Sequence, residues 1–234
     1  MCIDVHQMTA RPLESSDLRP AARLVCVCVG VPRTVPYQAK TITTGIYKEP
    51  VVGETWLRRL NLEGDRQADL NVHGGEHKAV YVYPSEHYSY WARVLGRNDL
   101  GPSQFGENFT VEGLLEEHLN IGDVFRVGEA LVQVSQPRTP CFKLGVRMGD
   151  AGFIARFIAE NRTGFYVRVL EEGRVRAGDA ITRVERAHDS ISVHAAFRLR
   201  HGLGGTRDEY EQAARATHVL PNWRAAFAKR LAET

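Results

Sequence analysis

The stretch Ala130-Leu-Val-Gln-Val-Ser-Gln-Pro-Arg-Thr-Pro-Cys-Phe-Lys-Leu144 connects a strand-like segment to a cysteine that stands between two cations. Residues 130–135 form the strand-like part. Proline fixes φ and disfavours helix in the residue before it, so Pro137 and Pro140 predict a rigid, non-helical turn that holds the thiol of Cys141. Arg138 and Lys143 favour the thiolate, which is the nucleophilic and metal-binding form of cysteine. Cys141 is therefore the first candidate for chemistry.

Short strands dominate the sequence on both sides of this stretch. Turn residues separate them, and the predicted strands are 24–31, 41–46, 79–83, 108–111, 124–127, 131–135, 165–170 and 180–184. Irregular spacing and many glycines favour a closed or barrel-like sheet over a doubly wound one. Two helices are expected inside this region, at 85–95 and 151–161, because apolar residues recur there at helical spacing. The predicted fold class is α+β, mainly β.

Helical periodicity replaces the strand pattern after about Ala187. Three segments carry it, at 192–200, 206–216 and 221–232, and a proline in the first turn favours the last of them. We expect a β-rich domain over 23–186, a small three-helix unit over 187–234, and a disordered extension over 1–22.

Composition excludes several classes of protein. Thirty basic and 28 acidic residues give a formal charge of +2 in 234 residues, and no long block of like charge predicts DNA or RNA binding. The longest apolar run, 24–31, is too short to cross a bilayer, and the first twenty residues lack the apolar region of a secretory signal. We therefore expect a cytoplasmic protein without a membrane partner.

The other cysteines do not form a disulfide framework, since the chain has only four. Cys26 and Cys28 are two residues apart in a predicted strand, which puts both thiols on one face. Small buried hydrophobic residues are the favoured interpretation, because a shared metal would need further ligands at zinc-site spacing.

Two polar clusters are further candidates. In Asn71-Val-His-Gly-Gly-Glu-His-Lys78, the adjacent glycines Gly74 and Gly75 would let backbone N–H groups approach an anion, although a tight turn with surface histidines explains the pattern as well. Glu107 and Asn108 lie between two aromatic residues. Desolvation there would raise the pKa of Glu107 and suit it to proton transfer, and Asn108 could read a heterocycle edge. A buried polar anchor for a loop remains the alternative.

The ordered set of short motifs resembles one family. It comprises Gly64-Asp65, Val72-His-Gly-Gly75, Gly106-Glu-Asn108, Gly122-Asp123 and Gln136-Pro-Arg-x-Pro-Cys-x-Lys-Leu144. This order resembles the MOSC domain, the module named after the C-terminal part of molybdenum cofactor sulfurases, and in particular its YiiM-like subgroup. The resemblance covers about 24–186, and the helical tail resembles the three-helix unit that follows the domain in that subgroup.

The resemblance implies a barrel-like fold that binds the molybdenum cofactor, with Cys141 at the position of the metal ligand. A soft thiolate suits such a centre. Arg138 and Lys143 would bind the cofactor's anionic groups. The other expected cofactor contacts are His73, Gly74, Gly75 and Asn108.

For the YiiM-like subgroup, the resemblance further implies reduction of small N-hydroxylated compounds, such as hydroxylamino-purines, to amines. Glu107 and His73 are the candidate proton handlers. Electrons would come from a separate flavin-type reductase, because no flavin, haem or iron–sulfur signature is visible. A monomer or a homodimer is expected.

Three alternatives stay open. The same fold could carry a persulfide on Cys141, although no pyridoxal-phosphate desulfurase domain is fused to this chain. It could be a non-enzymatic cofactor-binding or insertion protein that docks a client through its helical tail. A zinc hydrolase that uses His77 and Cys141 would need a third ligand, which the sequence does not supply.

Overall fold

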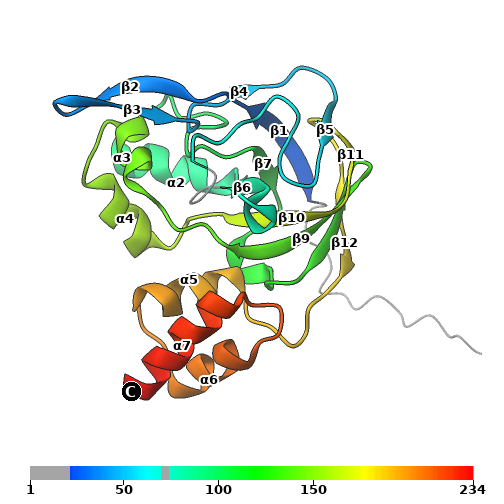
Figure 1. Ribbon diagram of the computed structural model, residues 1–234, viewed down its shortest axis with the longest axis vertical. Helices are drawn as coiled ribbons and strands as arrows, with labels where there is room; N and C mark the ends of the chain where they lie inside the picture. The colour runs from blue at the N-terminus through cyan, green and yellow to red at the C-terminus, as the bar shows by residue number, and fades with distance from the viewer. Residues whose placement is uncertain (1–21, 70–73, 234) are drawn as a thin grey trace, which may run out of the picture.

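A large, curled sheet forms the body of the computed structural model, which describes residues 22–69 and 74–233 (Figure 1). Its eight strands follow the order β12-β8-β9-β10-β6-β7-β1-β4, and only the β6–β7 pair is parallel. The strands are β1 (Arg23–Val29), β4 (Glu49–Pro50), β6 (Val80–Pro84), β7 (Phe109–Glu112), β8 (Val124–Val127), β9 (Ala130–Pro137), β10 (Phe165–Glu171) and β12 (Ile181–Glu185).

The two ends of this sheet approach each other. Arg23 in β1 forms an antiparallel bridge with Ala180, just before β12, and the Leu24 amide donates to the Asp179 carbonyl at 2.9 Å. The predicted α+β, mainly β class is thus confirmed. The sheet is barrel-like in its curvature, but this single bridge does not make it a closed barrel.

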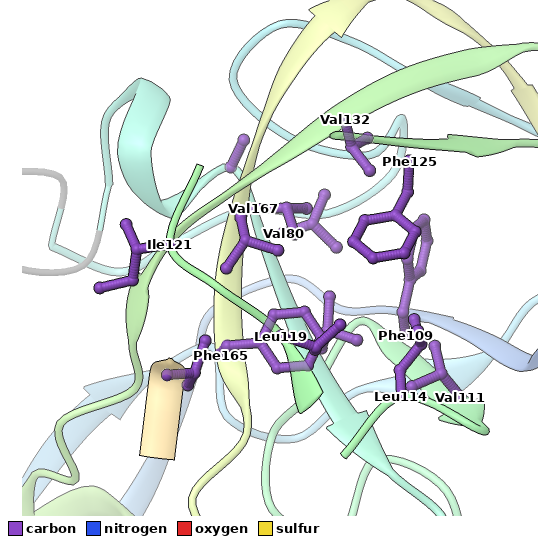
Figure 2. Packing of buried hydrophobic residues seen from close by; sticks show 14 of the residues in the cluster. Val80, Phe109, Val111, Leu114, Leu119, Ile121, Phe125, Val132, Phe165 and Val167 are labelled. Carbon is purple, nitrogen blue, oxygen red and sulfur yellow. The ribbon is translucent and has the colours of Figure 1, made fainter. Parts of the chain in front are cut away.

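The main core lies inside the curl (Figure 2). Val80, Phe109, Val132, Phe165 and Val167 are all at most 3% exposed and belong to one apolar cluster. Alternation along β9 turns one side of the strand inward, which is the pattern that predicted it.

Three C-terminal helices cover the lower side of the sheet in Figure 1: α5 (Val193–His201), α6 (Arg207–Arg215) and α7 (Pro221–Glu233). Side-chain caps begin two of them, since Ser192 accepts from Ala195 and Thr206 forms a capping box with Glu209. Residues of all three helices join the same apolar cluster as the strands.

A second, aromatic cluster packs on the other side of β6. It lies beneath α2 (Glu86–Leu95), α3 (Phe142–Met148) and α4 (Phe153–Glu160). Tyr83 stacks on Phe105 with ring centroids 4.3 Å apart, and Trp91 stacks on Phe157 at 5.6 Å. Aromatic ring pairs stabilise a fold beyond the effect of burying their apolar surface. These pairs therefore hold the loop that carries Phe105 against the sheet.

Several elements were not predicted. They are β2 (Arg33–Tyr37), the partner of the predicted strand β3 (Lys40–Thr44), the short pair β5 (Thr55–Leu57) and β11 (Gly173–Val175), the strand β4, the helix α3, and the 3₁₀ turns η1 (Glu76–Lys78) and η2 (Glu116–His118). Cys141 itself has extended backbone, with φ −121° and ψ 167°, but α3 begins at the next residue. The expected non-helical connection thus spans residues 138–141, and Cys141 is its last residue.

Other expectations have simpler outcomes. The extension over 1–22 lies, apart from Ala22, outside the described residues. Among the helices of 22–69 and 74–233, none combines the length and the apolar character that a bilayer crossing requires.

Candidate functional site

Cys141 lies at a cavity of about 90 Å³ beside the aromatic cluster. Segments from both halves of the chain meet there: the residues after β3, the loop around Asp65, the end of η1, the start of β6, and the turn between β9 and α3. The lining residues are Thr44, Gly45, Ile46, Lys48, Asp65, Arg66, Gln67, Ala68, Lys78, Tyr81, Phe105, Gly106, Asn108, Arg138, Thr139, Cys141, Lys143 and Tyr166.

The cavity is strongly cationic. Arg66, Lys78, Arg138 and Lys143 line it, and the Lys48 ammonium lies against Asp65, the one carboxylate among the described lining residues. That ion pair cancels internally, so basic side chains outnumber acidic ones among the described lining residues. Such an excess favours an anionic ligand.

Arg138 is the most distinctive of these cations. The residue is 5% exposed, yet its Nη1 atom is buried without a hydrogen-bond partner in the described part of the chain. Burial alone would lower the pKa of Arg138, but Tyr81, Tyr166 and Cys141 outweigh that effect and raise it. The guanidinium therefore stays charged, and a buried charge with an unused donor is costly unless a ligand completes it.

Cys141 is half-buried and close enough to the Arg138 guanidinium and to Tyr166 to affect the pKa of both. Extended backbone at residue 141 and the start of α3 at residue 142 fix the direction of its side chain. A thiolate held beside cations is a suitable ligand for a soft metal.

A buried polar network supports one wall of the cavity. Asp65 accepts from the Gly30 amide at 2.9 Å and from Asn108 Nδ2 at 3.0 Å, in addition to its contact with Lys48. Asn108 also donates to the Cys28 carbonyl and accepts from the Tyr81 amide, both at 3.2 Å. The Asn108 side chain lines the cavity, but its amide is committed to this network, as in the anchor interpretation.

Gly106 is required where this wall approaches the loop after β3. Its φ is +84°, and a Cβ atom there would lie 2.6 Å from Cγ1 of Ile46. Both the conformation and the close approach exclude a larger residue without movement of the wall.

Glu107 does not line the cavity. It is fully buried and accepts from the Ser103 amide at 2.9 Å, the Phe105 amide at 3.1 Å, the Thr110 hydroxyl at 3.1 Å and the Tyr88 hydroxyl. Burial raises its pKa despite these donors, in the direction expected from the sequence. Since it is not a lining residue, its placement argues against the role of proton handler.

The segment around Gly74 and Gly75 contributes a lysine to the cavity rather than its glycines. His73 lies outside the described residues, and neither Gly74 nor Gly75 lines the cavity. Lys78, three residues further on, does line it, and burial lowers its pKa. Sequence reasoning did not select Lys78, although its position directly before an apolar strand was visible.

Two other interpretations concern histidine and cysteine side chains. His77 and Cys141 line different cavities, and no group of three candidate metal ligands occurs within 22–69 and 74–233. The Sγ atoms of Cys26 and Cys28 lie 3.6 Å apart on one face of β1, and Cys28 is fully buried. A thiol–thiol hydrogen bond lowers the pKa of Cys26 and raises that of Cys28.

The chain is similar to known proteins over most of its length. A model of the MOSC domain matches residues 69–182. The Bacillus subtilis (strain 168) protein YflK is 46% identical over 202 residues, which are 86% of this chain and 91% of that protein. The crystal structure of YiiM from Geobacillus stearothermophilus superimposes with a TM-score of 0.73 at 32% identity, covering 90% of this chain and 99% of that one. A Gibberella moniliformis (strain M3125 / FGSC 7600) protein named "Reductase" is 36% identical over 65% of this chain and 28% of its own length.

Proposed function

The chain belongs to the MOSC domain family and is YiiM-like, and from this premise we propose that it binds the molybdenum cofactor at Cys141 and reduces N-hydroxylated compounds to amines. The observation that carries the proposal is a half-buried thiol in a cavity that is also lined by the basic residues Arg66, Lys78, Arg138 and Lys143. A phosphorylated, sulfur-rich pterin with a soft metal needs both features.

The chemistry of the residues present fits the metal and the anionic groups of this cofactor. Arg138 offers a buried donor without a partner, and Lys143 and Arg66 add charge at the same cavity. Cys141 would ligate the metal, while Arg138 and Lys143 would bind the anionic groups. Tyr81 and Tyr166 also line the cavity, with ring centroids 5.4 Å apart, and would lie beside a planar ring.

When bound, the cofactor supplies two-electron redox chemistry at a thiolate-ligated metal. The overall reaction consumes two electrons and two protons, and converts R–NHOH to R–NH₂ and water. Lys78 replaces Glu107 as our proposed proton donor, because its ammonium lies at the cavity and burial lowers its pKa. Lys143 would hold substrate or cofactor charge near the thiol. A separate flavin-type reductase would deliver the electrons, and the similarity to a protein named a reductase supports the redox assignment.

The experiment is a reduction assay with a hydroxylamino-purine and reduced methyl viologen as artificial donor. Protein purified from cofactor-competent cells should form the amine, and Cys141→Ser should abolish the activity. Cys26→Ser is the matched control, because Cys26 is also half-buried but does not line the cavity. Equal activity of Cys141→Ser and wild type would refute the metal-ligand role. A persulfide on Cys141 without amine formation would favour the sulfur-carrier alternative.

A further inference from the structure

A second cavity, of about 300 Å³, lies where the C-terminal helices meet the sheet. We propose that it is a binding site for a small organic phosphomonoester. The cavity is distinct from the one at Cys141, since the two share no lining residue. They are separated by η1, whose consecutive residues His77 and Lys78 line the second and the first cavity respectively.

Four cationic or ionisable nitrogen groups converge on the second cavity. His77 comes from η1, Arg168 from β10, His218 from the segment before α7, and Arg224 from α7 itself. No carboxylate occurs among the described residues that line it. Glu76, beside His77 in the chain, is engaged with Arg59 at 2.8 Å. This arrangement favours a dianion over a cation or a neutral ligand.

Two of these groups have unused hydrogen-bonding atoms. Nδ1 of His77 and Nε of Arg224 are buried, and neither has a partner within the described chain. Arg168 donates through Nε to Gln133 at 2.8 Å, which fixes the plane of its guanidinium. Buried polar atoms in native proteins are nearly always paired, so these two indicate a ligand that supplies hydrogen-bonding partners, including an acceptor for the Arg224 Nε–H group.

The cavity is a preformed part of the fold. His218 packs on Gly122, where a Cβ atom would lie 2.5 Å from the His218 Cγ atom, and φ of Gly122 is +101°. The Trp223 indole donates to Gln136 at 3.1 Å and so ties α7 to β9. Because both sides of the cavity are fastened, little ordering is needed on binding.

The size and the remaining walls indicate an organic group on the phosphate. A volume of about 300 Å³ is at the lower end of small-molecule sites and exceeds what a bare phosphate fills. Apolar side chains form part of the lining, beside the polar residues Gln133, Ser135 and Thr217; they are Val134, Val219, Leu220 and Pro221. A phosphomonoester carries close to two negative charges at neutral pH, which matches the two guanidinium groups.

Phenyl phosphate is a suitable probe. In the wild-type protein with ¹⁵N-labelled histidine, we expect saturable shifts of the ring signals of both His77 and His218, and tighter binding than for inorganic phosphate or for benzoate. The proposal is overturned if neither ring responds, or if inorganic phosphate binds as tightly. Because the wild-type protein is used, this result does not depend on the folding of a variant.

Calorimetry with variants assigns the site. Arg224→Met should weaken phenyl phosphate binding about tenfold to a hundredfold, since a hydrogen bond to a charged group is lost. Lys229→Met removes a charge from an exposed position of the same helix and should change affinity less than about twofold, as surface charges do. The titrations use the Arg138→Met background, which removes the buried anion donor of the first cavity. Equal losses in Arg224→Met and Lys229→Met would show a general charge effect and overturn the site.

Discussion

Asp65→Ala should be among the most destabilising single substitutions in this protein. The carboxylate lies against the Lys48 ammonium and accepts from the Gly30 amide and from Asn108, and both partners of the ion pair are at most 7% exposed. Removing one member of a buried pair costs about 3–5 kcal/mol, because the other charge stays buried without compensation. The two stranded N–H donors place the expected loss at the upper end of that range.

A double-mutant cycle separates the charge effect from the loss of packing. Lys48→Met should cost less than Asp65→Ala, since Asp65 keeps two donors. The pair Lys48→Met with Asp65→Ala should be less destabilised than the sum of the single variants by about 1–3 kcal/mol. Urea unfolding at pH 7, followed by circular dichroism, gives all four free energies of unfolding. A loss below about 1 kcal/mol in Asp65→Ala, on the scale of an exposed ion pair, would refute the reasoning.

Three further predictions concern the cavity, the backbone and pH. Arg138→Met should weaken phosphate binding at the first cavity, because the substitution removes a buried guanidinium with an unused donor; calorimetry measures the affinity, and an unchanged affinity would contradict the assignment. Gly164→Ala should lower the free energy of unfolding by about 1–3 kcal/mol, since φ is +68° and a Cβ atom would lie 2.3 Å from a carbonyl oxygen of β6. Gly96 has a similar φ of +62° but open space around it, so Gly96→Ala should be less destabilising. Thermal unfolding of both variants measures the difference. Burial lowers the pKa of His77 and of His201, so near pH 6 the unfolded chain binds protons more readily than the folded chain does. The free energy of unfolding should therefore fall as the pH drops from about 6.5 toward about 5. Replacing both residues with Gln should flatten this pH dependence in urea unfolding, and an unchanged pH dependence would contradict the prediction.

Local patterns predicted the fold well where one face of an element is buried. Alternation identified strands such as β9, and helical spacing, with a proline in the first turn of the last helix, identified all three C-terminal helices. The helix α3 was missed because only seven residues form it, Pro140 precedes it closely, and Gly145 lies inside it. The pair β5–β11 joins segments more than a hundred residues apart, and no local pattern encodes that pairing.

The candidate site shows the same division. Functional residues that lie close together in the sequence could be predicted. Cys141, Arg138 and Lys143 were selected as one group, and all three line one cavity. The sequence does not reveal which of two adjacent side chains reaches the cavity. Asn108 lines it, whereas Glu107 is buried elsewhere and accepts hydrogen bonds from donors such as the Ser103 amide and the Thr110 hydroxyl. Lys78, Arg66 and Tyr166 come from separate segments of the chain and meet at the cavity only through the tertiary fold. The predicted domain limits and the roles of individual site residues remain predictions.

The most direct test of the central claim is the molybdenum and pterin content of protein purified from cofactor-competent cells. We predict about one molybdenum and one pterin for each wild-type chain, and loss of molybdenum from Cys141→Ser with the fold retained. Wild-type protein that contains neither molybdenum nor pterin, under conditions that load another molybdenum enzyme in the same cells, would contradict the claim.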